Sequence, residues 1–250
     1  MLQAIYHNQV ESEFRQYLKL KEDTFTSAVL ENLLLLPDEL FLEILSNAAE
    51  KPFEEKLLGN LLEYEFWPHW DAEGTSNENY VEPDVFLRFE KADMIIEAKR
   101  YDTSDHDCSQ WQNEIQAYFN EYRQENENEE ENEKSLIFIS LGGTKLTCEF
   151  ENRNISHYHI NWKRLHQEVQ KTIDDLNNLK YNQERKYFLR EYTFIIRILK
   201  NVLLGFELHG FFPMEWFKDF NFVKVEKLFI EEYEKSLQVI KDWIFKTTNK

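Results

Sequence analysis

The chain has 250 residues, of which 42% are hydrophobic and 15% aromatic, so it can build a packed core and is not expected to be disordered as a whole. No apolar run approaches the about 20 residues that span a bilayer, and residues 1–4 lack the start of a signal peptide. Only Cys108 and Cys148 are present, which predicts no disulfide framework and a reducing cytoplasm.

The net charge of −18 argues against a general nucleic-acid coat, because phosphate binding depends on Lys and Arg. The charge is unevenly spread along the chain. Residues 125–133 hold six acids and no base, which is typical of a solvated low-complexity loop. Residues 153–190 instead hold eight Lys or Arg and four acids. A local phosphate-binding face is therefore compatible with the composition if a divalent metal or a partner assists it.

The first third of the chain predicts helices separated by prolines, after a polar segment that ends near residue 22. Helices are expected over residues 24–36, with Asp23 or Thr24 as the N-cap, and over residues 39–49 and 53–62. Residues 63–70 alternate enough to form a strand, and residues 71–79 form a polar loop.

Residues 82–100 predict a β-hairpin, because apolar runs at 85–89 and 94–96 flank a short polar turn at Glu90-Lys91. A turn centred there places opposed residues in defined pairs: Asp84 and Glu97, Phe86 and Ile95, Arg88 and Asp93, and at the far end Glu82 and Lys99. The opposite face of the hairpin is wholly apolar and consists of Val85, Leu87, Met94 and Ile96.

Charged side chains gather on the polar face of this hairpin. Glu97 and Lys99 point to the same side, since side chains alternate along a strand. Asp84 and Glu97 are like charges whose proximity is unfavourable unless a cation lies between them. The pattern is compatible with a metal site and equally with a solvated hairpin that has charged rims.

The second half of the chain predicts a helix over residues 107–122, a buried strand over 135–140 and a turn over 141–144. From residue 161 onward the pattern is helical. The expected segments there are a long helix over 183–208, a break at Gly210 and Pro213, and a last helix over 225–245. Without repeats or a Pro/Gly-rich linker, we expect one domain: a core over residues 1–150 and a mainly helical extension over 151–250 packed on it.

In this context the chain resembles the PD-(D/E)XK nuclease superfamily over residues 22–140. The residues that carry the resemblance are Pro83-Asp84 on the first hairpin strand and Glu97-Ala98-Lys99 on the second. The order of elements also matches, with a helix before the hairpin and a helix and a strand after it. The resemblance implies an α/β fold with a central mixed β-sheet flanked by helices, a restriction-endonuclease-like core, here followed by a helical C-terminal portion.

The resemblance further implies a metal-dependent hydrolase that cuts phosphodiester bonds. Asp84 and Glu97, with the backbone carbonyl of Ala98, would hold Mg²⁺ or Mn²⁺ through oxygen ligands. Lys99 would position the attacking water or stabilise charge on the phosphate. The implied substrate is nucleic acid, with DNA as the first choice, and the implied setting is restriction, repair or phage defence.

Related nucleases add polar residues from neighbouring helices. For the acid on the first core helix the candidates are Glu22, which precedes the expected cap, and Glu31, which could face the sheet. On the next helix Gln110 and Glu114 are four residues apart and share a face. Gln110 is the preferred candidate, and Gln112 competes with it.

Other sequence features give weaker evidence for a catalytic or metal-binding role. His157 and His159 could share a strand face, but no acid is spaced to complete a site, and we expect them to be exposed to solvent. The Phe-rich segment around Trp216 predicts a core or an interface for a protein partner or a second copy of the chain. Two alternatives stay open: a catalytically silent nuclease-like fold that acts as a binding or assembly module, and an unrelated α/β binding protein.

Overall fold

The computed structural model describes residue 13 and residues 21–54, 58–122, 134–150, 154–181 and 189–211. The chain divides into two units, Met1–Phe211 and Phe212–Lys250. The acidic loop expected over residues 125–133, the segment around Trp216 and the helix expected over 225–245 lie outside the described residues.

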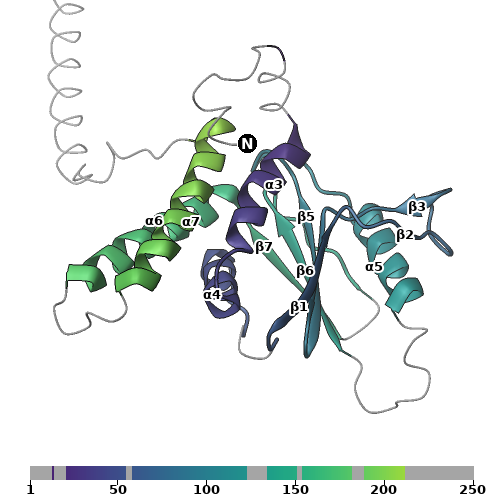
Figure 1. Cartoon of the computed structure of the whole chain (residues 1–250). Coiled ribbons are helices and arrows are strands. Elements are labelled where there is room, and N and C mark those ends of the chain that lie inside the picture. The colour runs from purple at the N-terminus through teal and green to yellow at the C-terminus, as the bar shows by residue number, and fades with distance from the viewer. Residues whose placement is uncertain are drawn as a thin grey trace, which may run out of the picture. The chain divides into compact units, whose positions relative to one another are not determined.

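A five-stranded mixed sheet forms the centre of the first unit, in the order β1-β4-β5-β6-β7 (Figure 1). The strands β1, β4 and β5 are antiparallel neighbours, and β6 and β7 continue the sheet in parallel to β5. Their bounds are Leu61–Phe66, Val85–Phe89, Ala92–Ala98, Ser135–Leu141 and Ile155–Ile160. The short strands β2 (Trp70–Asp71) and β3 (Tyr80–Val81) pair separately.

Helices cover both faces of this sheet (Figure 1). One face packs against α3 (Glu22–Leu33), α4 (Asp38–Ala48), α6 (Trp162–Tyr181) and α7 (Leu189–Leu208), and the other against α5 (Cys108–Tyr122). Alternation divides each strand between two cores, so that Leu87 and Met94 join the first cluster and Phe86 and Ile95 join the second. The predicted fold class, a mixed sheet flanked by helices, is confirmed.

The predicted hairpin register is confirmed where β4 and β5 pair. Phe86 lies opposite Ile95, and Arg88 lies opposite Asp93 with 4.0 Å between Arg88 Nε and Asp93 Oδ1. The expected pair of Glu82 and Lys99 does not form. The ladder of β4 begins only at Val85, and the Lys99 N–H donates to the Leu141 carbonyl of β6, while Glu82 contacts His69.

Two predictions about the helices are wrong. The helix expected over residues 53–62 is absent from its described part, where Leu58 lies in a turn and residue 61 already begins β1. The first core helix begins at Glu22, before the expected cap. Strand β7 contains His157 and His159, the pair considered above as sharing a strand face, and it extends the sheet beyond residue 150 within the first unit.

The two cysteines also differ from the prediction, because Cys108 and Cys148 form a disulfide with Cα atoms 5.8 Å apart. The bond links the first residue of α5 to the segment that follows β6. Pairing across 40 residues could not be deduced from two isolated cysteines. In the described part of the chain, no helix is long and apolar enough to cross a membrane.

Candidate active site

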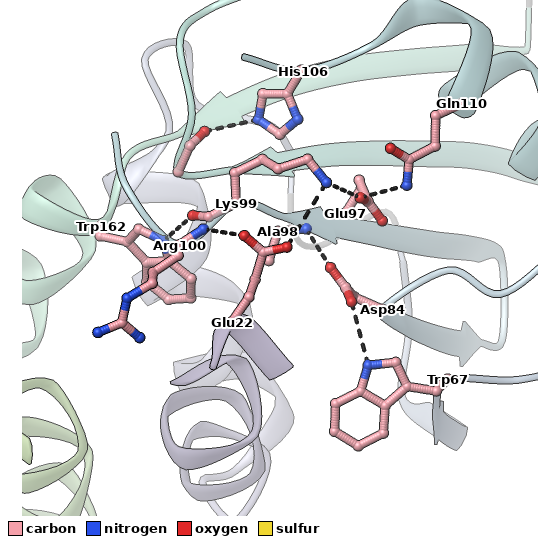
Figure 2. Close-up of polar contacts among 11 residues, drawn as sticks. Glu22, Trp67, Asp84, Glu97, Ala98, Lys99, Arg100, His106, Gln110 and Trp162 are labelled. Atoms are coloured by element: carbon pink, nitrogen blue, oxygen red, sulfur yellow. Dashed lines mark hydrogen bonds and ion pairs between the residues drawn. The ribbon is translucent and has the colours of Figure 1, made fainter. Parts of the chain in front are cut away.

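Polar side chains from four parts of the fold meet at the end of β5 (Figure 2). Glu97 is the last residue but one of this strand, and Lys99 directly follows the strand. Asp84 directly precedes β4, and Glu22 is the first residue of α3. Gln110 adds an amide from the first turn of α5.

Glu97 is the centre of this cluster, with 2% of its surface exposed. Lys99 Nζ and Gln110 Nε2 both donate to Glu97 Oε1, at 2.6 and 2.7 Å. Burial raises the pKa of Glu97, and the charge of Lys99 opposes that shift. The predicted contact between Glu97 and Lys99 is therefore present, and one ammonium group lies against this deeply buried acid.

Asp84 is held by two donors on its two carboxylate oxygens. The Ala98 N–H donates to Oδ2 at 2.8 Å, and the indole N–H of Trp67 donates to Oδ1 at 3.3 Å. Burial and then the charge of Glu97 raise the pKa of Asp84 well above its usual range. The two acids therefore act on each other as neighbours across the hairpin.

The structure distinguishes the two candidate acids of α3. Glu22 Oε2 accepts a 2.5 Å hydrogen bond from the Arg100 N–H, and its Oε1 lies 4.0 Å from Lys99 Nζ. The Arg100 guanidinium in turn donates to the Lys21 carbonyl just before the helix. Glu31 is exposed and lies apart from these contacts. Because α3 begins earlier than expected, Glu22 is the acid that reaches the cluster.

The structure also separates the candidates on α5. Gln110 contacts Glu97, whereas Gln112 is exposed. Glu114 has 1% of its surface exposed, and neither of its oxygens has a hydrogen-bond partner among the described residues. Burial and then the charges of Glu97 and Asp84 raise the pKa of Glu114 well above its usual range.

The sequence pattern paired Glu114 with Gln110 but gave it no role. The signal that could have found it is its place in the apolar stripe of the helix, between Trp111 and Tyr118, which are both buried. An acid in a buried stripe is unusual without a partner or a function.

The donor set has the chemistry of a site for a hard divalent cation, since it offers carboxylate and carbonyl oxygens. The residues that could hold such an ion are Asp84 and Glu97 through their carboxylates and Ala98 through its backbone carbonyl. Among the described residues, no three His, Cys, Asp or Glu side chains form a group that could hold a metal. The candidate ligands therefore consist of two side chains and one backbone oxygen.

A histidine cluster lies beside the acids, contrary to the expectation of exposed histidines. Ser140, which pairs with Glu97 across β5 and β6, has its Oγ 2.9 Å from His157 Nε2 and 3.0 Å from His159 Nδ1. The third member, His106, donates from Nε2 to the Gly142 carbonyl at 2.9 Å. Burial lowers the pKa of His106 and of His157 to about 4, so both are neutral at about pH 7.

The turn after β6 fixes the backbone of Lys99. Gly142 has a φ of +69°, and a Cβ there would overlap the Lys99 carbonyl oxygen and the indole of Trp162. That indole donates to the same carbonyl at 2.7 Å. The predicted turn thus supports the site through close packing against the Lys99 backbone.

Comparison with known proteins finds a related sequence but does not assign the chain to a family. The chain is 27% identical over 219 residues to an uncharacterized protein of Pasteurella multocida, across 79% of this chain and 73% of the relative. No family model matches the sequence, and no solved structure matches the fold.

Proposed function

We propose that this protein is a metal-dependent nuclease that hydrolyses phosphodiester bonds in DNA. The observation that carries the proposal is the meeting of Asp84, Glu97 and Lys99 at the end of the hairpin, with Glu22 and Gln110 beside them. Two acids and an amine on adjacent strand ends are the groups that metal-assisted phosphate hydrolysis requires.

The buried charge supports a cation at this place. The cluster has an excess of acids, and the positive charge of Lys99 acts on all four of them: Glu22, Asp84, Glu97 and Glu114. Burial raises the pKa of three of these acids, which means that the folded protein holds their negative charges at a cost. A divalent cation would offset that cost.

Asp84 and Glu97, with the Ala98 carbonyl, would hold Mg²⁺ or Mn²⁺. Such an ion lowers the pKa of bound water and polarises a phosphate oxygen. Lys99 would orient the attacking water or stabilise charge on the phosphate, because its ammonium already lies on the Glu97 side of the cluster. Gln110 would hold the Glu97 carboxylate in place.

The test combines metal binding with cleavage. Calorimetry with Mn²⁺ should give saturable binding that Asp84→Ala abolishes, and linear and plasmid DNA should be cut in Mg²⁺ by the wild type but not by Glu97→Ala or Lys99→Ala. Glu22→Gln should weaken both signals, and Glu31→Gln, an exposed acid on the same helix, is the matched control. Wild-type protein that cuts neither DNA nor RNA in Mg²⁺ or Mn²⁺ would refute the proposal.

The alternative of a silent binding module is favoured by the contact between Lys99 and Glu97, since this ion pair satisfies a deeply buried acid without a metal. Calorimetry separates the two functions. An absence of Mn²⁺ binding together with retained stability of the Asp84→Ala variant would favour the module.

We also propose restriction, repair or phage defence in the cytoplasm as the setting. The disulfide weakens the argument from cysteine content, because such bonds are commoner in oxidising compartments. Partner binding through the aromatic C-terminal segment stays a prediction.

A further inference from the structure

Trp67 has a backbone conformation that bulky residues rarely adopt. Its φ is +52°, and among the described residues it is the one non-glycine residue with a positive φ. A left-handed conformation is unfavourable for a side chain of this size and persists where surrounding contacts over-determine it. The contacts that hold Trp67 therefore indicate what the conformation achieves.

Two hydrogen bonds join Trp67 to one residue, Asp84, and Figure 2 shows the one from the indole. The backbone N–H of Trp67 donates to the Asp84 carbonyl at 3.1 Å, and the indole N–H donates to the Asp84 Oδ1 atom at 3.3 Å. The other carboxylate oxygen accepts from the Ala98 N–H at 2.8 Å. Each oxygen of the carboxylate thus has one fixed donor, which defines the rotation of the group.

Packing alone does not account for this residue. The ring of Trp67 is half-buried, and its described ring contact is with Phe66, whose centroid is 5.5 Å away. A half-buried ring could meet Phe66 from an unstrained backbone. Because Phe66 pairs with Val85, the Trp67 backbone N–H meets the Asp84 carbonyl as a continuation of the β1–β4 ladder, and it is the indole whose contact with Asp84 Oδ1 accompanies the left-handed conformation.

We propose that Trp67 is a positioning residue that holds the Asp84 carboxylate in the orientation in which it binds the metal. The inference rests on the proposed function and extends it to a residue outside the motif. Donors that orient a ligating carboxylate typically contribute about 10–100-fold to metal affinity. Removal of the indole N–H should therefore weaken Mn²⁺ binding by about tenfold or more, without removing a ligand.

The experiment is Mn²⁺ calorimetry on the full chain, with thermal unfolding of each variant in EDTA. Trp67→Phe keeps an aromatic ring and loses the donor. Trp67→Gly loses the ring but readily adopts the positive φ, so the backbone conformation is preserved even where the phenylalanine variant fails to fold. Trp70→Phe is the control, since Trp70 packs against Phe86 on the α5 side of the sheet.

Both Trp67 variants should raise the Kd for Mn²⁺ about tenfold or more, whereas Trp70→Phe should lower the Tm and leave the Kd unchanged. Either folded Trp67 variant with a Kd within about twofold of the wild type would overturn the inference and leave the proposed function intact. Wild-type protein that binds no Mn²⁺ would overturn both.

Discussion

Substitution of Lys99 by Met should expose the cost of the buried Glu97 charge. The Lys99 Nζ atom lies 2.6 Å from Glu97 Oε1, and the Glu97 side chain is 3% exposed. Breaking a buried ion pair from one side costs about 3–5 kcal/mol. Because the Lys99 side chain is itself 19% exposed and partly solvated, we expect a smaller loss, about 2–3 kcal/mol, at about pH 8.

The loss should depend on pH through Glu97. Burial raises the pKa of this carboxyl in the folded protein, and Lys99 lowers it, so the variant's pKa lies higher still. A carboxyl with a raised folded pKa stabilises the protein below its unfolded pKa, and that stabilisation is lost as the pH rises through the folded pKa. Lys99→Met should therefore approach wild-type stability at about pH 5 and be weakest at about pH 8.

Urea unfolding in EDTA at about pH 5, 6.5 and 8 measures this difference. The double variant Glu97→Gln with Lys99→Met should recover stability at the highest pH, because glutamine carries no charge to bury. Lys91→Met is the control, since Lys91 is exposed at the hairpin turn and should change stability by about 0.5 kcal/mol or less. A loss that is equal at every pH, or a double variant no more stable than Lys99→Met, would refute the reasoning.

The turn glycine, the disulfide and the metal ligands give three further predictions. Gly142→Ala should lower the free energy of unfolding by about 3 kcal/mol or more, because a Cβ there would overlap neighbouring atoms and strain the backbone. Gly210→Ala, with open space around the added Cβ, should lower it by about 1–2 kcal/mol. Equal melting temperatures of the two variants would contradict this prediction. Reduction of Cys108–Cys148 should lower the free energy of unfolding by up to about 4 kcal/mol, and an unchanged urea midpoint would argue against the pairing. Mn²⁺ affinity should rise from about pH 5 to about pH 8, because burial raises the pKa of Asp84 and protons therefore compete with the metal for its carboxylate. An affinity that does not change with pH would count against Asp84 as a ligand.

The part of the site that lies on the hairpin was predictable because its information is local. Alternating residues fix the register of β4 and β5, and a shift by one residue would turn Val85 and Met94 away from the first core cluster and Asp93 and Glu97 into it. That register brings Asp84 close to Glu97, and alternation along β5 places Lys99 on the same side as Glu97. The fold class follows from the same alternation together with the amphipathic helix α5.

The parts that the sequence left open or missed depend on contacts between distant segments. Glu22 reaches the cluster because α3 begins at this residue and Arg100, 79 residues from Lys21 along the chain, bonds to both Glu22 and Lys21. Strand β7 is short and half-polar, so its sequence does not show that it pairs with β6. The histidines on β7 contact Ser140 of β6, and His157 packs against the rings of Trp111 and Phe138, contacts that no local pattern predicts.

The contacts that support Lys99 make the segment after residue 150 part of the site. The Trp162 indole at the start of α6 donates to the Lys99 carbonyl, and the Gly142 N–H donates to the Ile160 carbonyl of β7. These contacts fix the backbone from which the ammonium reaches Glu97. A nuclease-like core that ended at residue 150 would keep every motif residue and lose this support. The catalytic amine of the proposed mechanism therefore depends on a region that the motif does not include.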